Sequence, residues 1–415
     1  MKYPGYYEFS CRARIVAGEQ ALERIPGLLA AIGGQRPMLV TDRGVVEAGL
    51  LDRFTAAVAD GLTIACTVDD VPVDSSVTVV NRIADLYREK GCDAVIALGG
   101  GSVLDTAKGV NIVVSESARA LMDLAGAGRI NRPLKPMVAV PTTAGTGSEV
   151  TLVAVIADTE KHVKLPFTSY YLVPDFAVLD TRMTLTLPPV ITAATAMDAL
   201  THAVEAYTCL QKNPISDALA WQAISLIGTH LMAVMTHPDD PDGRLALATA
   251  ACLAGAAFSN AMVGVVHAIG HSVGAICHVP HGVCMAVLLP YGLEYNHHKN
   301  GHLTGELLLP LAGPDIYVAT PAGRRADRVI EAVRELNGQL REATGGRHPC
   351  CLSQIRDAEG AQVVPNERLP EIAKTAMGDG SLLYNPEQLD YEDLLMVAQA
   401  AWEGEPLDRS KVHRG

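Results

Sequence analysis

The chain has few aromatic side chains, which make up 5% of its 415 residues, and only 19% of its residues are charged. Apolar residues make up 49%, and most of them are Ala, Val, Leu and Ile. This composition favours helices packed on a sheet or on one another around a large core. A chain of this length is too long for one ordinary domain and suits two.

Basic stripes are absent, and the net charge is -13. A protein that gains affinity by neutralising phosphates needs such stripes, so we expect no nucleic-acid partner. The opening residues MKYPGYYEFSCRARI contain no apolar run typical of a signal peptide. The nine cysteines form no CxxC pair, which indicates reduced thiols in a cytoplasmic protein.

Residues 245–293 contain no Asp, Glu, Lys or Arg. Such a stretch resembles a membrane span, but it is rich in Ala and Gly and is interrupted by Pro280 and Pro290. We therefore expect a buried helical core and no membrane attachment. Histidines are almost the only ionisable groups in this stretch, at positions 267, 271, 278 and 281.

The first half of the chain alternates strand-like and helix-like segments, which is typical of a parallel sheet with helical crossovers. The predicted strands are 38–41, 62–68, 94–98, 137–140 and 152–157, and the predicted helices between them include 46–59 and 77–90. After Leu187 the strand signals stop, and residues 190–275 and 325–345 have helical spacing. We predict an α/β fold with a Rossmann-like parallel-sheet domain over 1–187, an all-α domain over 188–415, and an active site in the cleft between them.

A glycine-rich turn follows the strand 94–98, with the sequence Gly99-Gly100-Gly101-Ser102. Glycines let the backbone turn sharply and let a ligand approach closely. Ser102 is predicted to cap the next helix, with Asp105 completing a capping box. The start of that helix would offer free amide protons to a pyrophosphate, although the turn is not the usual GxGxxG fingerprint.

A second loop, Pro141-Thr-Thr-Ala-Gly-Thr-Gly-Ser-Glu149, follows the strand 137–140 and presents hydroxyl and amide groups. Two such loops after two strands indicate a site for phosphate or ribose. Asp42 ends the strand 38–41, where a carboxylate accepts from a ribose hydroxyl and favours NAD over NADP. Taken alone, an Asp at this position is more often a cap or turn residue than a ribose contact.

Asp198 and His202 are four residues apart in a helical stretch, so both side chains share one face and suit one metal ion. The uncharged region supplies further ligands, and spacing alone favours His267 with His271, again four apart. A mixed set of oxygen and nitrogen ligands suits Fe(II), Zn(II) or another divalent ion.

The ordered motifs GGGSxxDxAK, PTTAGTGSE, MDALTHAVEAY and HAxxHxxG followed by HG resemble the iron-containing (group III) alcohol dehydrogenases, over residues 9–293. In place of that family's Asn-Pro-Thr-like turn the chain has Val71-Pro-Val-Asp-Ser75. The resemblance implies the metal ligands Asp198, His202, His267 and His281, which leaves His271 beside the site as a candidate catalytic proton relay. The implied cofactor contacts are Asp42, Gly100, Gly101, Ser102, Thr142, Thr143, Ser148, Lys164 and Leu179.

The expected reaction is hydride transfer between a nicotinamide cofactor, NAD more than NADP, and a small neutral primary alcohol or aldehyde, with the metal as Lewis acid. We expect a homo-oligomer, a dimer or larger. One alternative is a hydroxyacid-oxoacid transhydrogenase that keeps NAD tightly bound. A less favoured alternative is a lyase resembling dehydroquinate synthase, which would need a cluster of basic residues for its polyanionic substrate. The non-enzyme alternative is a metal-stabilised binding protein, which would turn over no alcohol.

Overall fold

The computed structural model describes residues 3–73, 75–116, 120–158 and 163–412, except the side chains of Val163 and Lys164. The chain divides into two compact units. The α/β unit comprises residues 10–187 and 239–255, and the helical unit comprises residues 1–9, 188–238 and 256–415. Asp74, in the turn that departs from the family pattern, lies outside the described residues.

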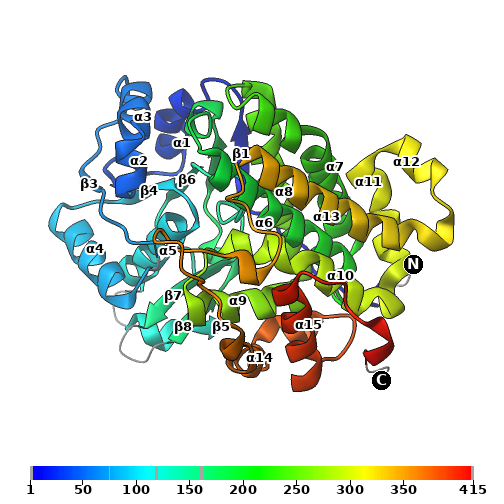
Figure 1. The fold of residues 1–415 in the computed structure, drawn as a ribbon. Coiled ribbons are helices and arrows are strands. Elements are labelled where there is room, and N and C mark those ends of the chain that lie inside the picture. The colour runs from blue at the N-terminus through cyan, green and yellow to red at the C-terminus, as the bar shows by residue number, and fades with distance from the viewer. Residues whose placement is uncertain (1–2, 74, 117–119, 159–162, 413–415) are drawn as a thin grey trace. The chain divides into compact units, whose positions relative to one another are not determined.

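The α/β unit is built on a six-stranded sheet in the order β1-β9-β6-β4-β2-β3 (Figure 1). All of its strand pairs are parallel, which confirms the predicted parallel sheet. The central strands are apolar and buried along their whole length, as strands covered on both faces should be. The strands are β1 (Arg14–Ala17), β2 (Pro37–Val40), β3 (Cys66–Val68), β4 (Ala94–Gly99), β6 (Met137–Pro141) and β9 (Phe176–Leu179).

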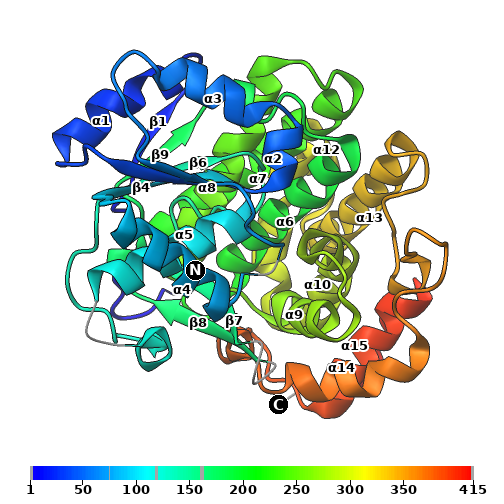
Figure 2. The ribbon, with the colours of Figure 1, turned by 90° about the vertical axis from the view of Figure 1, so that its left-hand side faces the viewer.

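Helices cover both faces of this sheet, and each face has its own hydrophobic core (Figure 2). On one face, α4 (Val77–Glu89) and α5 (Gly101–Ser115) bury residues such as Ile83 and Leu104. On the other face, α1 (Ile25–Ala31) and α3 (Leu50–Val58) bury Leu29 and Phe54. The even burial of both faces explains why the strands have no polar alternation.

The predicted strand 152–157 forms, but outside the parallel sheet. It is β7 (Val153–Asp158), which pairs antiparallel with β8 (Val163–Thr168). With β5 (Gly126–Ala127) these strands make a separate three-stranded sheet. Pairing partners cannot be inferred from an apolar run alone, because antiparallel and parallel strands share the same period.

Other predicted segments differ in length. The helix predicted over 46–59 is two helices, α2 (Arg43–Glu47) and α3, because Gly49 between them has a left-handed φ of 70°. The strand predicted over 62–68 shortens to β3, since only Cys66–Val68 pairs with β2. The strands β1, β5, β8 and β9 were not predicted.

The strands of the sheet end before Pro188, and the helical unit resumes there, apart from residues 239–255, which belong to the α/β unit. The helices of the helical unit include α6 (Pro189–Thr208), α9 (Val265–Cys277) and α10 (His281–Glu306), which pack on one another and are largely buried. The helix α8 (Pro241–Ala261) begins in the α/β unit and ends in this one. The remaining helices are α7 (Pro214–Thr236), α11 (Leu308–Ala312), α12 (Pro314–Ala319), α13 (Arg325–Ala343), α14 (Leu369–Ala376) and α15 (Tyr391–Glu403).

Within the described ranges of the chain, one helix, α7, is long and apolar enough to cross a membrane, and 39% of its apolar window is buried. The pair α8 and α9 also passes by composition, but the two are bent by 105°. Length and composition are weak evidence for a span, because core helices of water-soluble enzymes share them. Here α7 packs against α6 and α11.

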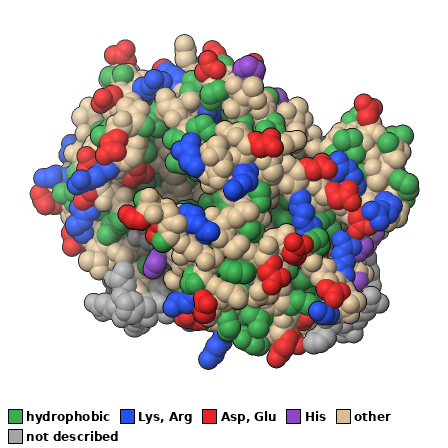
Figure 3. Space-filling view, in the orientation of Figure 1, with side chains coloured by type: hydrophobic (Ala, Val, Ile, Leu, Met, Phe, Trp, Pro, Cys, Tyr) green, Lys and Arg blue, Asp and Glu red, His purple; other side chains and the backbone are tan. Residues whose placement is uncertain are grey.

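Charged side chains of both signs are interspersed over the face shown in Figure 3. No extended area of Lys and Arg forms on this face among the described residues. This face therefore offers no basic patch of the kind that binds a polyanion.

Candidate metal centre and cofactor loops

Asp198, His202, His267 and His281 come together inside the helical unit. Each offers one ligand atom, and the four atoms lie within 4.8 Å of one another. Asp198 and His202 project from one face of α6, His267 lies in the first turn of α9, and His281 begins α10. The structure thus groups the four residues that the family resemblance implies, and His271, which spacing alone favoured, is not in the group.

Local packing explains how the three helices converge. Gly282, directly after His281, allows α10 to approach α6, because a Cβ there would lie 2.5 Å from the carbonyl oxygen of Ala194. The His202 ring is stacked on Phe258 with centroids 4.2 Å apart. The HG pair in the sequence therefore supplies a ligand and the close approach that positions it.

The cluster contains polar atoms that the protein leaves unpaired. Asp198, His202 and His267 are at most 5% exposed. Among their atoms, Oδ1 of Asp198, Nδ1 of His202 and Nε2 of His267 lack a hydrogen bond of normal geometry, and Oδ1 of Asp198 lies 3.3 Å from Nε2 of His281. Buried polar atoms are normally satisfied, so three such atoms beside one another indicate a missing common partner. A cation fits that need, because all three are electron-pair donors.

Electrostatics favours the protonation states that bind a metal. Burial would raise the pKa of Asp198, but the imidazoles of His202 and His281 outweigh it and lower that pKa. Burial lowers the pKa of His202 to about 3 and holds the pKa of His267 well below its usual value. At neutral pH the cluster therefore holds the carboxylate of Asp198 and neutral imidazoles at His202 and His267, as metal ligation requires.

His271 lies at the rim of the cluster. Its side chain is 46% exposed, and its ring is stacked on His281 with centroids 5.3 Å apart. Nδ1 is 2.8 Å from a carboxylate oxygen of Asp379, which lies in the C-terminal region where the motif resemblance is thin. His278, the fourth histidine of the uncharged stretch, is exposed and ends α9 in a left-handed conformation.

The two predicted loops meet in the α/β unit. They follow β4 and β6, which are neighbours in the sheet. A Cβ on Gly100 would touch Thr143 at 3.4 Å, and one on Gly101 would lie 2.9 Å from Thr146. The glycines thus let the loops pack together, and they also leave the start of α5 without side chains.

Asp42 lies at the same edge of the sheet, because it follows β2, the other neighbour of β4. The chain leaves β2 toward β3 and leaves β4 toward β6, in opposite directions across the sheet. Ligands of open α/β sheets bind at such a switch point, beyond the carboxyl ends of the strands. Asp42 also caps α2 by accepting from the amide of Val45 at 2.9 Å.

The predicted capping box at α5 is wrong. Gly100 is the N-cap and makes no side-chain cap, while the hydroxyl of Ser102 donates to the carbonyl of Val73. Asp105 instead accepts from the hydroxyl of Ser148 at 2.8 Å and from the amide of Val155 at 2.9 Å. Tertiary partners replace the local cap, because the carboxylate of Asp105 binds Ser148 of the second loop and Val155 of β7, and not the start of its own helix.

The other predicted cofactor residues occupy varied positions. Thr142 is buried and donates its amide to the carbonyl of Gly99 at 3.1 Å, and Leu179 is buried at the carboxyl end of β9. Ser148 is buried, and its hydroxyl donates a hydrogen bond to Asp105 and accepts one from Lys108. Lys164 lies in β8, and its side chain is outside the described part of the chain.

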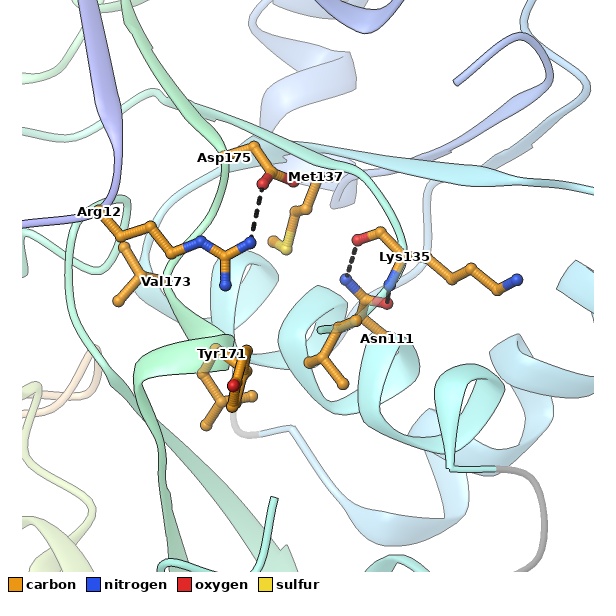
Figure 4. Close-up of a pocket in the computed structure, with 9 residues that line it drawn as sticks. Arg12, Asn111, Lys135, Met137, Tyr171, Val173 and Asp175 are labelled. Atoms are coloured by element: carbon orange, nitrogen blue, oxygen red, sulfur yellow. Dashed lines mark hydrogen bonds and ion pairs between the residues drawn. The ribbon is translucent and has the colours of Figure 1, made fainter. Parts of the chain in front are cut away.

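A small pocket lies at the opposite edge of the sheet (Figure 4). It adjoins Met137 and Asp175, at the amino ends of β6 and β9. Asp175 pairs with Arg12 at 3.4 Å and accepts from the amide of Met137 at 2.9 Å. Its position, away from the carboxyl ends of the strands, gives no support to a cofactor site there.

Sequence and structure comparisons agree on one family. Residues 12–181 match the model of the iron-containing alcohol dehydrogenases, and residues 192–402 match the C-terminal model of the Fe-containing alcohol dehydrogenase family. The chain is 36% identical to an NAD-dependent methanol dehydrogenase of Bacillus methanolicus, over 93% of this chain and 97% of that one. It is 32% identical to an NADPH-dependent butanol dehydrogenase of Clostridium saccharobutylicum, over 96% and 99%.

A third relative is a sulfoacetaldehyde reductase of Bilophila wadsworthia, which is 30% identical over 94% of this chain and 97% of that one. Among solved structures, that of a 1,3-propanediol oxidoreductase superposes with a TM-score of 0.88 and 31% identity, over 96% of this chain and all of that one. The α/β unit and the helical unit agree with this structural match. The chain therefore belongs to the iron-containing alcohol dehydrogenase family of oxidoreductases.

Proposed function

We propose that the protein transfers hydride between NAD and a small, neutral primary alcohol or its aldehyde, using one divalent ion, Fe(II) or Zn(II), held by the helical unit. The observation that carries this proposal is the cluster of four ligand groups within 4.8 Å, three of which have a buried atom without a hydrogen-bond partner. When bound there, the ion supplies a Lewis acid that makes the hydroxyl of an alcohol more acidic. Asp198 contributes one negative charge to the site, and the imidazoles of His202, His267 and His281 complete it.

We propose that residues 1–187 bind the dinucleotide. The loops after β4 and β6 and the carboxylate of Asp42 support this assignment, because they gather at the switch point of the sheet. The proposed contacts are Asp42, Gly100, Gly101, Ser102, Thr142, Thr143, Ser148, Lys164 and Leu179. We propose residues 188–415 as the domain that binds metal and substrate, in a cytoplasmic homo-oligomer.

His271 is the proposed proton relay to solvent. Its exposed ring beside His281 gives it access both to water and to a substrate bound at the cluster. The carboxylate of Asp379 holds Nδ1, so Nε2 is left to exchange a proton with the substrate oxygen. An exposed imidazole suits this role better than His202 and His267, which are buried.

The preference for a neutral substrate follows from the charge-free stretch 245–293, which supplies two of the four ligands. An anion would leave water for surroundings with no Lys or Arg in that stretch, and an unpaired buried charge is costly. An apolar pocket instead selects by size, at about 1–3 kcal/mol per methylene, so we expect several chain lengths to be accepted.

Two alternatives keep the same site. An anionic alcohol is favoured by the relative that reduces sulfoacetaldehyde, and it would need a cation from beyond Asn300, such as Arg324, Arg325 or Arg356. A transhydrogenase would use the same hydride chemistry but retain its NAD.

Steady-state rates with Fe(II), Zn(II) or Mn(II) added to metal-free protein test the proposal. Butanol and 1,3-propanediol should outperform 4-hydroxybutyrate, 2-hydroxyethanesulfonate and a phosphorylated alcohol. An anion that is faster by an order of magnitude would overturn the neutral-substrate proposal. Stoichiometric NAD that survives purification would favour the transhydrogenase, and no turnover with any compound would reject the proposed function.

A further inference from the structure

The first turn of α9, which carries His267, is held by acceptors from distant parts of the chain. A helix leaves its first amide groups without partners inside the helix. Here the amide of Val265 donates to Oδ1 of Asn385 at 3.1 Å, and the amide of Val266 donates to Oε1 of Glu205 at 2.8 Å. The N-cap residue is Gly264, which has no side chain to cap the turn. Two remote residues therefore replace a local cap.

Glu205 also holds the His267 ring. Its second oxygen, Oε2, lies 2.5 Å from Nδ1 of His267. One carboxylate thus bridges the backbone amide of Val266 and the ring of the next residue, which fixes both the position and the rotation of the imidazole. With Nδ1 engaged by the carboxylate, Nε2 is the nitrogen left for the cluster, and Nε2 is the buried atom without a partner.

Glu205 lies on α6, the helix that also carries the ligands Asp198 and His202. Asp198, His202 and Glu205 are spaced i, i+4 and i+7, so they lie along one face of the helix. That face provides two ligands and the group that orients a third. Metal-binding histidines commonly present their other nitrogen to a carboxylate that orients the ring and increases its basicity.

Asn385 belongs to the piece Tyr384-Asn385-Pro386, which lies far from the motifs that define the cluster. It is buried, and its side-chain amide makes two hydrogen bonds as acceptor and two as donor. Besides Val265, it exchanges two hydrogen bonds with the side chain of Asn296 on α10, at 2.8 and 3.0 Å, and donates to the carbonyl of Glu387 at 2.7 Å. Asn385 therefore ties α9 to α10, the helix that carries His281.

Gly264 gives independent support for this arrangement. A Cβ at this position would lie 2.7 Å from Oδ1 of Asn385 and 3.1 Å from Oε1 of Glu205. Only glycine lets both acceptors reach the turn together. The glycine that leaves α9 uncapped is thus the residue that admits its two remote partners.

We infer that Glu205 and Asn385 are positioning residues for the metal centre: Glu205 orients His267 directly, and Asn385 acts through the first turn of α9. This inference rests on the proposed function, since it needs the cluster to bind an ion. A purely structural tie between α6, α9 and α10 would predict lower stability without a specific loss of metal affinity.

Co(II) binding to the full chain after chelation separates the two roles. Absorbance titration gives the Kd, and the d–d bands report the coordination of the ion. We expect Glu205→Gln, which keeps an acceptor for Val266 but loses the carboxylate charge, to weaken Co(II) binding by about 10–100-fold and to alter the bands. Asn385→Ala should weaken binding by about fivefold or more, because it acts one step further away.

Matched controls exist in the same unit. Glu294 is a buried carboxylate that pairs with Arg334 and accepts from the amide of Leu407. Asn337 is a buried amide that holds the carbonyl of Ala286 and the ring of His348. Glu294→Gln and Asn337→Ala should lower thermal stability and leave the Kd and bands for Co(II) unchanged. Circular dichroism of each metal-free variant checks folding, and Glu205→Asp replaces Glu205→Gln if the latter does not fold.

The outcomes are distinct. If wild-type protein binds Co(II) and both Glu205→Gln and Asn385→Ala match its affinity and bands, the positioning role is overturned while the metal site stands. If the controls lose affinity equally, the effect is one of general stability and the inference is again wrong. If wild-type protein binds no Co(II), the proposed function itself fails, and the inference fails with it.

Discussion

The ammonium group of Lys108 on α5 donates a hydrogen bond of 3.0 Å to the hydroxyl of Ser148 in the loop after β6. Lys108 is completely buried, and it also donates to the carbonyls of Thr151 at 3.0 Å and Val153 at 2.8 Å. The hydroxyl of Ser148 in turn donates a hydrogen bond to Oδ1 of Asp105. The helix that begins at the first glycine loop is therefore fastened to the second loop by a buried charged network.

Lys108→Met should weaken the attachment of α5 to the loop after β6. Burial already lowers the pKa of Lys108 to about 8, and removal of Lys108 would leave the partly buried carboxyl of Asp105 without its neighbouring cation. Breaking such a buried network typically costs about 3–5 kcal/mol. We expect a lower free energy of unfolding in urea and a raised Kd for NAD. Co(II) affinity, a property of the helical unit, is the internal control, and an unchanged Kd for NAD would contradict the role given to Lys108.

Glu149, the last residue of the second loop, should make stability depend on pH. Burial raises its pKa to about 7, with Lys108 on α5 and Cys252 on α8 as its charged or titratable neighbours. Because the folded-state pKa lies above the unfolded value of 4.5, the folded protein holds the proton more tightly. The protonated side chain of Glu149 therefore makes its full contribution to the free energy of unfolding below pH 4.5, and this contribution is lost as the pH rises through 7.

Glu149→Gln removes this dependence. Urea unfolding at each pH gives the free energy of unfolding of both proteins. The value for the variant minus that for wild type should rise between pH 4.5 and 7, by up to about 3 kcal/mol. Glu116→Gln, which replaces another buried carboxylate of the α/β unit, is the control. A difference between Glu149→Gln and wild type that stays flat across this range, or that changes in the opposite direction, would contradict the pKa assigned to Glu149.

The sequence predicted the α/β and helical halves well, because long segments with a clear period leave few alternatives. Features that depend on the conformation or tertiary partners of a single residue could not be predicted from the sequence. Gly49 divides one predicted helix by its left-handed φ, and β1 is a four-residue edge strand without alternation. The assignment of Asp105 to a local cap was wrong because its partners, Ser148 and Val155, lie more than forty positions away.

At the metal cluster, spacing along the chain could select residues only within one helix. Asp198 and His202 were therefore predicted from their separation, whereas His281 had to come from the family resemblance. Asn385 could not be linked to the cluster at all, since it lies 120 positions from the amide that it binds. Glu205 had a usable signal: it is on the same helical face as His202, three residues further on.

Cofactor preference should depend on the charge of Asp42. At the carboxyl end of β2, this carboxylate would accept from the 2′-hydroxyl of NAD and repel the 2′-phosphate of NADP. Asp42→Asn keeps the oxygen that caps α2 through Val45 and loses only the charge. We expect the ratio of kcat/KM for NAD to that for NADP to fall by about tenfold, with unchanged stability. Asp52→Asn, an exposed position on α3, is the control; a wild-type preference for NADP that survives in Asp42→Asn would show the proposal to be wrong.

His267 and His271 should differ in what their removal does. Both lie on α9, with ring centroids 5.7 Å apart, but His267 is buried with Nε2 unpaired, while His271 is 46% exposed and held by Asp379. We expect His267→Ala to lose most of the one divalent ion per chain, because the three remaining groups leave a coordination position open. His271→Ala should keep its ion and lose about a hundredfold in kcat, as removal of a proton-transfer group does.

Elemental analysis after gel filtration measures the ion, and single-turnover hydride transfer with NAD measures the rate. Asp379→Asn supplies an intermediate case, because it keeps an acceptor near Nδ1 of His271 and removes only the charge. It should retain full metal content and lose less rate than His271→Ala. If the His271 variant loses its ion while the His267 variant keeps it, the ligand set proposed here is wrong, and the pair four residues apart on α9 becomes the better choice. If both the His267 and the His271 variants keep the ion, Asp198, His202 and His281 alone form the site. The buried Nε2 of His267, which has no hydrogen-bond partner, then needs a partner other than the ion.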